Sequence, residues 1–353
     1  MNGTRLLDTI HSPADVKRLD FGQLQELCAE IRAFLIDSVS KTGGHLSSNL
    51  GTIELTVALH KVFATPSDKF VWDVGHQCYT HKILTGRREG FDRLRMLGGI
   101  SGFPSPRESE HDAFIAGHGN TSLSAAIGMA QAKKLRHEPG KVIAVVGDGA
   151  FTGGMIYEGM NNIRTLRNLI VILNDNKMSI SKNIGSMAQY LTKLRTNPGY
   201  FKAKRDVQSM LDAVPFVGVP IRQGLQVAKG AVRRMMYHST MFEEMGFQYA
   251  GPVDGHDVAG LCELFRAFRD EQVAPLFLHI CTQKGKGYPP AEENPGEFHG
   301  VSAFDLKAKL DPDVSKEDSF STVFGQQLAD FGDQDTALCA VTAAMKYGTG
   351  LQY

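Results

Sequence analysis

The sequence predicts an α/β fold in which a mostly parallel β-sheet carries helices on both faces. A short apolar run at 142–146 ends at Gly147-Asp148-Gly149, and a helix can begin near Gly154. Five apolar residues at helical spacing follow between 155 and 166, and a second apolar run occupies 169–173. A strand, a helix and a strand in this order form a right-handed crossover, so the two strands are parallel and end at the same edge of the sheet.

Two polar side chains follow these two predicted strands. Asp148 comes directly after the first strand, and Asn176 comes shortly after the second. Because the carboxyl ends of parallel strands meet at one edge, we expect the two side chains to converge. A carboxylate, an amide oxygen and a nearby backbone carbonyl suit Mg²⁺ that keeps phosphate oxygens in its other positions. The helix that begins after Gly153 directs free N–H groups to the same place, so a magnesium ion bridging a diphosphate is predicted.

Two other nucleotide-binding motifs do not fit this stretch. A dinucleotide fingerprint G-x-G-x-x-G would need glycine at position 152, where Thr152 stands, and Asp148 would face the pyrophosphate. A phosphate-binding loop of the form G-x-x-x-x-G-K-[ST] is absent from the sequence. The three residues GDG alone are equally compatible with a simple turn, so the longer pattern carries the interpretation.

Composition favours a globular protein that acts on small molecules. With 353 residues and 42% apolar residues, the chain can bury a large core in one α/β domain or two smaller ones. Lys plus Arg equals Asp plus Glu at 38 each, so no overall charge favours nucleic acid or an anionic membrane. The five cysteines are odd in number and form no C-x-x-C pair, which predicts reduced thiols and a cytoplasmic location. We expect no signal peptide and no membrane span.

The remaining elements follow in chain order. An amphipathic helix is expected at 21–40 and a second at 50–63, with the break Gly43-Gly44-His45 between them. A strand at 70–73 brings His76 to the ligand-bearing edge, and a basic helix at 81–88 follows. The segment 98–106, GGISGFPSP, predicts a long surface loop that can cover a site. A helix at 123–135 follows, with Thr121 and Ser122 as candidate N-caps.

The second half is less regular. We expect helices at 187–194 and 224–236 within a solvated helical insertion at about 182–245, an interpretation that we prefer to phosphate binding by its basic residues. Residues 251–257, GPVDGHD, predict a turn before a helix capped by Asp257, and a strand at 275–281 leads to 282–288. Residues 305–320 have the composition of a linker, and a helix at 321–331 and a strand at 337–344 follow it.

The spacing of GDG and NDN, with GDGAFTGGM and NDNKMSIS around them, resembles the thiamine diphosphate motif of the transketolase superfamily. Within it, the chain is similar to the 1-deoxy-D-xylulose-5-phosphate synthase family, in GPVDGHD and GGISGFPSP as well. The resemblance implies thiamine diphosphate and Mg²⁺ as cofactors. Three positions depart from the family: Lys177 stands where Glu is common, and Gly119 and Asn120 change GHSSTS to GHGNTS at 117–122.

The resemblance also implies roles for individual residues. His45 is expected over the thiazolium and the substrate, and His299 as a second active-site histidine. The implied metal ligands are Asp148, Asn176 and the backbone carbonyl of Met178. The implied cofactor contacts are His76, Gly117, His118, Gly119, Gly149, Ala150, Asn176 and Tyr288.

The implied domain organisation is a diphosphate-binding domain at 1–304, a linker at 305–320 and, at 321–353, the truncated start of a pyrimidine-binding domain. By resemblance the chain is the amino-terminal half of a homodimeric transferase. It condenses pyruvate with glyceraldehyde 3-phosphate, releases carbon dioxide and starts isoprenoid, thiamine and pyridoxal synthesis. The half that carries the pyrimidine domain is the expected partner. Two alternatives remain open: the amino-terminal subunit of a transketolase, and a non-catalytic module that binds magnesium and diphosphate.

Overall fold

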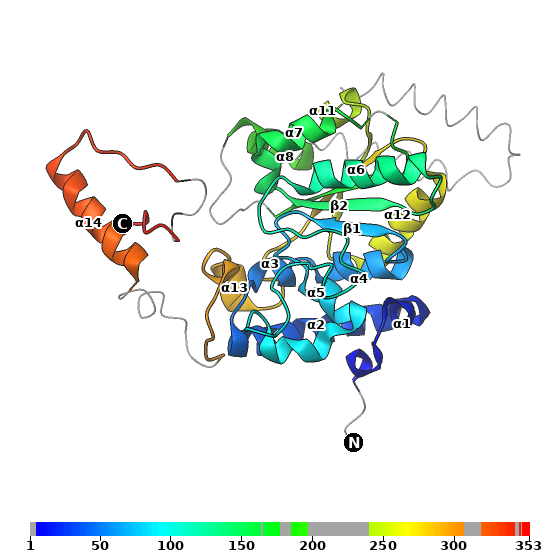
Figure 1. Cartoon of the computed structure of the whole chain (residues 1–353), viewed down its shortest axis with the longest axis horizontal. Helices are drawn as coiled ribbons and strands as arrows, with labels where there is room; N and C mark the ends of the chain where they lie inside the picture. The colour runs from blue at the N-terminus through cyan, green and yellow to red at the C-terminus, as the bar shows by residue number, and fades with distance from the viewer. Residues whose placement is uncertain are drawn as a thin grey trace, which may run out of the picture.

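The computed structural model describes residues 5–163, 165–176, 185–196, 240–306, 319–342, 346 and 348–353. Its centre is a five-stranded sheet in the order β1-β2-β3-β5-β4, and all neighbouring strands are parallel (Figure 1). The predicted fold class is therefore confirmed. The strands are β1 Lys69–Trp72, β2 Val142–Gly147, β3 Leu169–Asp175, β4 Gln248–Asp254 and β5 Leu276–Cys281.

Helices flank the sheet on both faces. Those before β2 are η1 Leu6–Thr9, α1 Pro13–Arg18, α2 Phe21–Thr42, α3 Ser47–Leu50, α4 Ile53–Val62, α5 Tyr79–Lys82, η2 Ile83–Arg87, η3 Arg88–Arg93 and α6 Ser122–Leu135. Those after β2 are η4 Ala150–Thr152, α7 Gly154–Met160, α8 Ser186–Thr196, α11 Met241–Glu244, α12 Val258–Glu271, α13 Pro289–Glu293, η5 Glu297–His299 and α14 Phe320–Gln334.

The alternation of side chains along the central strands builds two separate cores. On one face, Ile143, Val145 and their neighbours pack with the apolar sides of α2, α4 and α12. On the other face, Ala144 and Val146 pack with α6, α7 and α11. All residues of β3 are buried, as expected of a central parallel strand covered on both faces.

Four local predictions need correction. The helix expected at 50–63 is two helices, α3 and α4, and the basic helix at 81–88 is the short α5 followed by the π-helical segment η2. The first part of the turn at 251–257 is the end of strand β4. Gly251 and Pro252 are tolerated there because β4 is an edge strand whose pairing with β5 shifts between Ala250 and Val253. The described part of the strand expected at 337–344, residues 337–342, forms no strand, because it has no neighbouring strand to pair with.

Side-chain hydrogen bonds fix the loops that precede helices α12 and α6. Asp257 caps α12 as predicted, because its side chain accepts a hydrogen bond from the Gly260 amide. The expected caps of α6 do not act as caps. The carboxylate of Asp73, at the end of β1, instead accepts hydrogen bonds from the amides of Asn120 and Ser122 and from the Ser122 hydroxyl.

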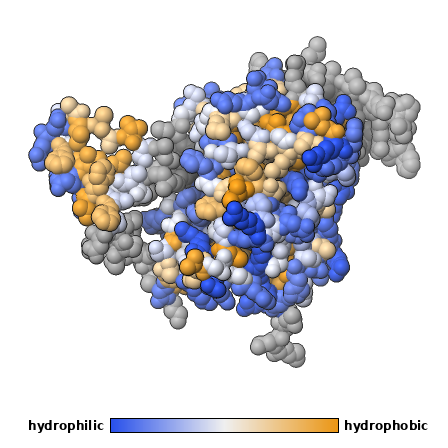
Figure 2. Space-filling model, viewed as in Figure 1, coloured by the Kyte–Doolittle hydropathy of each residue, from blue (hydrophilic) through white to orange (hydrophobic). Residues whose placement is uncertain are grey.

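α14 lies to one side of the sheet domain, and its surface in Figure 2 is rich in apolar side chains. Among them, Phe320 is 97% exposed, and Phe324 and Phe331 are more than half exposed. The predicted helix at 224–236 lies outside the described residues. No described helix has the length and apolar character needed to cross a membrane.

Candidate active site at the carboxyl edge of the sheet

Asp148 and Asn176 converge at the carboxyl ends of β2 and β3, as predicted. The Asp148 amide donates to the carbonyl of Asn174 (3.1 Å), and the amides of Asn176 and Gly149 donate to the Asp148 carboxylate. Asp148 is only 3% exposed. Burial, reinforced by the nearby Asp175 carboxylate, raises the pKa of Asp148 to about 7, and the Lys284 ammonium opposes this rise.

Buried hydrogen bonds connect Asp175, at the end of β3, with His279 of β5 and Tyr249 of β4. His279 Nε2 lies 2.9 Å from Asp175 Oδ2, and His279 Nδ1 lies 3.0 Å from the Tyr249 hydroxyl. Because a carboxylate only accepts hydrogen bonds, Nε2 carries the proton in neutral His279, and the Tyr249 hydroxyl donates to Nδ1. These bonds link the end of β3 to the middle of β5 and, through Tyr249, to the first part of β4.

Lys284, in the segment 282–288, is a functional candidate that the sequence did not single out. It follows β5 and is 8% exposed. Burial lowers the pKa of Lys284 to about 8, and Asp148 opposes this shift. The Lys284 charge also lowers the pKa values of His76 and His299, so the acidic and histidine parts of the edge share one electrostatic environment.

Three predicted histidines form one cluster. The ring centroids of His45, His76 and His299 lie between 5.0 and 5.6 Å from one another. The Ser48 hydroxyl lies between two of the rings, 3.1 Å from His76 Nε2 and 3.4 Å from His299 Nδ1. The side-chain amide of Asn49 donates to the carbonyls of His45 and His76, so it fixes their backbones.

The cluster keeps its imidazoles neutral. Burial, followed by the Arg95 charge, lowers the pKa of His45 to about 4. Burial, followed by Lys284 and His45, lowers the pKa of His299 to about 3, and burial also lowers the pKa of His76. Nδ1 of His45 and Nδ1 of His76 are buried without a hydrogen-bond partner among the described residues. At pH 7 these imidazoles are therefore neutral, and each can donate a hydrogen bond from one ring nitrogen and accept one at the other.

The loop at 98–106 has no regular structure, as predicted, and it forms a wall of this cluster. The Phe103 ring lies 5.7 Å from the His45 ring. Two acidic groups hold the loop: the half-buried Glu108 accepts from the Ser101 amide (2.6 Å), and the buried Asp112 accepts from the Ser105 amide (2.7 Å). The buried Lys82 ammonium pairs with Glu108, and Arg87 pairs with Asp112 in a bidentate arrangement.

The turn at 117–119 lies beside the GDG segment. A Cβ placed on Gly119 would lie 3.8 Å from the Ala150 Cβ, whereas one placed on Gly117 would meet nothing within 4 Å. His118 is exposed. Asn120 adopts a φ of +72°, and its side chain fills the space that a Cβ on Gly153 would need. The departure from GHSSTS therefore contacts the start of α7.

The residues present fit a magnesium-bound diphosphate. The donor set contains a buried carboxylate and an amide, which are the ligands that Mg²⁺ takes in proteins. A divalent cation would also offset the repulsion between Asp148 and Asp175. Open space lies over Gly117, Gly147 and Gly154, where an added Cβ would meet no atom within 4 Å. The backbone there can approach a bulky anion.

Two predicted positions are not joined to the site by the described contacts. The ring of Tyr288 packs on Phe298, with centroids 5.5 Å apart, and its amide donates to the Gly285 carbonyl. Met178 and Lys177 lie outside the described residues. Ser48 and Asp73 were not predicted as site residues, since a serine in a helix and an aspartate after a strand are too common to stand out before the tertiary contacts are known.

Comparison with known proteins gives a consistent result. A family model described as 1-deoxy-D-xylulose-5-phosphate synthase matches residues 7–282. The enzyme of that name from Caldanaerobacter subterraneus subsp. tengcongensis is 49% identical over 347 residues, which are 98% of this chain and 56% of that protein. The one from Natranaerobius thermophilus is 47% identical over 350 residues, covering 99% and 55%. The chain thus spans about half the length of the curated relatives it matches.

Solved structures with the same fold are transketolases. The enzyme from Campylobacter jejuni superposes with a TM-score of 0.58 at 18% identity, over 81% of this chain and 41% of that chain. The one from Leishmania mexicana superposes with a TM-score of 0.55 at 16% identity, over 93% and 44%. At these identities the likeness shows the fold alone.

Proposed function

Since the chain belongs to the 1-deoxy-D-xylulose-5-phosphate synthase family, we propose that it forms the part of such an enzyme that holds Mg²⁺ and the diphosphate of thiamine diphosphate. The observation that carries this proposal is the convergence of Asp148 and Asn176 at one sheet edge, in the same electrostatic environment as the cluster of His45, His76 and His299. The complete enzyme then condenses pyruvate with glyceraldehyde 3-phosphate and releases carbon dioxide.

In this proposal the metal ligands are Asp148, Asn176 and the Met178 carbonyl. Gly149 and Ala150 adjoin the diphosphate on one side, and the turn of Gly117, His118 and Gly119 adjoins it on the other. His76 and Tyr288 complete the cofactor contacts. The open space over Gly117 and Gly147 and the position of Gly119 beside Ala150 support this arrangement.

When bound, thiamine diphosphate supplies an electron sink that stabilises a carbanion. The chain's own residues then hold and move protons. His45 and His299 are the proposed catalytic groups, because both rings are half-buried at this edge and, as neutral imidazoles, each can donate one hydrogen bond and accept another as protons move. The Phe103 wall limits the access of water to His45, which strengthens electrostatic interactions there.

The remaining parts of the proposal concern the whole protein. The partner is the half that carries the pyrimidine-binding domain, and the complete enzyme is a homodimer that starts isoprenoid synthesis and feeds thiamine and pyridoxal synthesis. The exposed apolar face of α14 supports a partner there, since large apolar patches are usually covered. A cytoplasmic location is supported by five cysteines that are all free.

Calorimetric titration of the chain with thiamine diphosphate tests the proposal directly. We expect magnesium-dependent binding by the wild-type chain and none by Asp148→Ala, since the metal loses its charged ligand. Asp92→Ala, which removes an exposed carboxylate, is the matched control and should bind as the wild type does. Unchanged affinity in Asp148→Ala would show that the metal assignment is wrong.

A further inference from the structure

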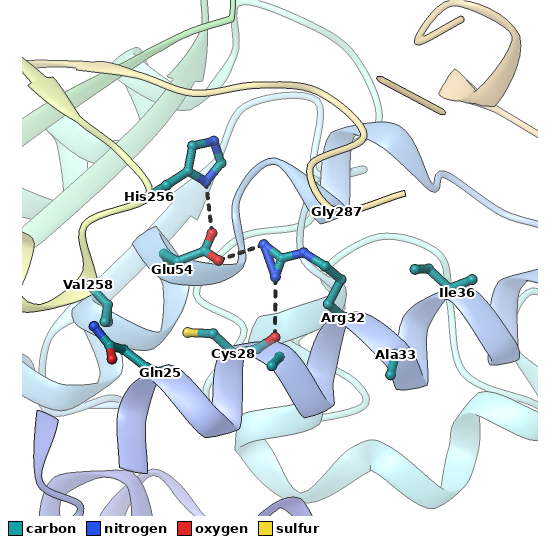
Figure 3. A pocket seen from close by; sticks show the side chains of 10 residues that line it. Gln25, Cys28, Arg32, Ala33, Ile36, Glu54, His256, Val258 and Gly287 are labelled. Carbon is teal, nitrogen blue, oxygen red and sulfur yellow. Dashed lines mark hydrogen bonds and ion pairs between the residues drawn. The ribbon is translucent and has the colours of Figure 1, made fainter. Parts of the chain in front are cut away.

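Glu54 of α4 joins two groups from distant parts of the chain (Figure 3). One carboxylate oxygen pairs with Arg32 Nη2 of α2 at 2.6 Å, and the other lies 3.0 Å from His256 Nδ1, in the loop after β4. The three side chains are between 11% and 16% exposed. His256 belongs to the GPVDGHD segment, to which the proposed chemistry assigns no task.

Both partners of Glu54 also hold the segment 282–288, which follows β5. Arg32 Nε donates to the Lys286 carbonyl (2.7 Å), and the Gln283 amide donates to His256 Nε2 (2.9 Å). Because Nε2 accepts this bond, the proton of neutral His256 is on Nδ1, which donates to Glu54. The Glu54 carboxylate thus orients Arg32 and His256, and these two side chains hold the segment by hydrogen bonds to the backbone at residues 283 and 286.

Lys284 lies between residues 283 and 286, whose backbones are held by these hydrogen bonds. Its ammonium is buried and acts electrostatically on Asp148, His76 and His299. The segment lies so close to Arg32 that a Cβ on Gly287 would be 2.4 Å from Arg32 Cδ, and Gly287 has a φ of +80°. The same short segment thus contacts Arg32 and His256 and carries the lysine that acts on the active-site edge.

We propose that Arg32, Glu54 and His256 form a clamp whose task is to position Lys284 toward Asp148. The inference rests on the proposed function, because the position of Lys284 matters for catalysis only if Asp148 holds a magnesium-bound diphosphate. A fixed ammonium there balances part of the diphosphate charge, and its geometry matters because an interaction between close charges depends steeply on distance in a buried site. The three clamp residues are positioning residues.

The contacts around the clamp indicate that it can be removed by mutation without unfolding the segment that it holds. Its three side chains line a pocket of about 390 Å³ together with Gln25, Cys28 and Ile36, and none of the clustered histidines lines it (Figure 3). A backbone bond from the Gly285 amide to the Ser47 carbonyl (2.9 Å) also holds the segment. Loss of the clamp should therefore loosen the segment without unfolding it.

Hydrogen exchange of the chain without cofactor tests the clamp. His256→Leu removes the acceptor of the Gln283 amide, whereas His256→Gln keeps an acceptor of similar reach. We expect exchange in the peptide covering 281–288 to become roughly five- to tenfold faster in His256→Leu, the effect of losing one ordinary hydrogen bond, and to be partly restored in His256→Gln. Gln25→Ala, which lines the same pocket, should exchange as the wild type does. Wild-type rates in His256→Leu would overturn the clamp.

A variant that exchanges faster throughout the chain would reflect general destabilisation. In that case Arg32→Met provides a second test of the clamp, because it removes the hydrogen bond to the Lys286 carbonyl and leaves the bond at Gln283 in place. Faster exchange confined to 281–288 in Arg32→Met supports the clamp, and unchanged exchange there rejects it.

A double-mutant cycle tests whether the clamp acts through Lys284. His256→Leu should weaken magnesium-dependent binding of thiamine diphosphate roughly tenfold in the wild-type background, the loss expected of a displaced charged contact, and should have little further effect in Lys284→Met. Equal losses in both backgrounds would reject positioning of Lys284. Absence of binding by the wild-type chain would instead contradict the proposed function, and the exchange result would still decide whether the clamp exists.

Discussion

The Phe103 ring meets the His45 ring at an interplanar angle of 64°, from a loop that the carboxylates of Glu108 and Asp112 fix in place. The contact joins a glycine- and proline-rich segment without regular structure to a proposed catalytic histidine. It makes the loop a fixed wall of the site, since Glu108 and Asp112 bind backbone amides on either side of Phe103.

Replacing Phe103 should change the ionisation of His45. Burial is the largest cause of the low pKa of His45, about 4, so Phe103→Ala admits water and should raise this pKa toward 6.5. Histidine NMR titration of the chain measures the shift. Phe331→Ala, an exposed position on α14, should leave the His45 titration unchanged. A His45 pKa that stays near 4 in Phe103→Ala would show that other groups bury the ring.

His45→Asn and His299→Asn should reduce turnover in a complete enzyme far more than they reduce cofactor affinity. Loss of a proton-transfer group costs about a hundredfold to ten-thousandfold in rate. Steady-state kinetics and a cofactor titration separate the two effects. His137→Asn is the matched control, because His137 is exposed and asparagine tolerates its φ of +54°. Equal losses of turnover and affinity would indicate a structural role.

The purified chain should release no carbon dioxide from pyruvate with thiamine diphosphate and Mg²⁺. The proposed reaction belongs to proteins of about twice this length. By resemblance to the family, we expect the carboxylic acid that activates the aminopyrimidine of the cofactor to come from the pyrimidine-binding domain. Activity should appear when a separately expressed carboxyl-terminal half is added. Turnover by the chain alone would mean that an acid within residues 1–353 activates the cofactor.

Acid should destabilise the chain through the buried pair His60 and His81. Their ring nitrogens lie 2.9 Å apart, and His81 Nε2 donates to Asp112. Burial, followed by the His81 charge, lowers the pKa of His60 well below 6.5, and burial also lowers that of His81. Since the unfolded histidines bind protons more readily, stability is complete above pH 6.5 and is lost as the pH falls toward the folded pKa values.

The expected slope is up to about 1.4 kcal/mol of unfolding free energy per pH unit for each histidine. Urea denaturation between pH 7.5 and 4.5 measures it. His60→Gln should flatten the slope, whereas replacement of the exposed His137 by Asn should not. An equal slope in wild type and His60→Gln would exclude this pair as the cause.

The sequence predicted the parts of the site that depend on strand order alone. Asp148 and Asn176 converge because parallel strands end at one edge, and His76 follows a strand at the same edge. His45 and His299 were expected at the site only from the family resemblance. Lys284 was not recognised as a site residue, because a glycine-flanked lysine is usually exposed and only tertiary contacts bury it. Strand β4 was missed because Gly251-Pro252 is typical of a turn. A strand can contain this pair only at the edge of a sheet, and the sequence did not show that β4 is an edge strand. The proposed roles of Tyr288 and Met178 stay predictions.

The strand order has a consequence for synthesis on the ribosome. β1, β2 and β3 follow one another along the chain, but the next partner of β3 is β5, whose Leu276 pairs with Ile170, 106 positions earlier (276 minus 170). At a synthesis rate of about 5–20 residues per second, one edge of β3 stays unpaired for roughly 5 to 20 seconds until β5 has been made. During that time its row of free backbone groups can recruit another strand. Nascent chains stalled between residues 180 and 275 should therefore be the most dependent on chaperones.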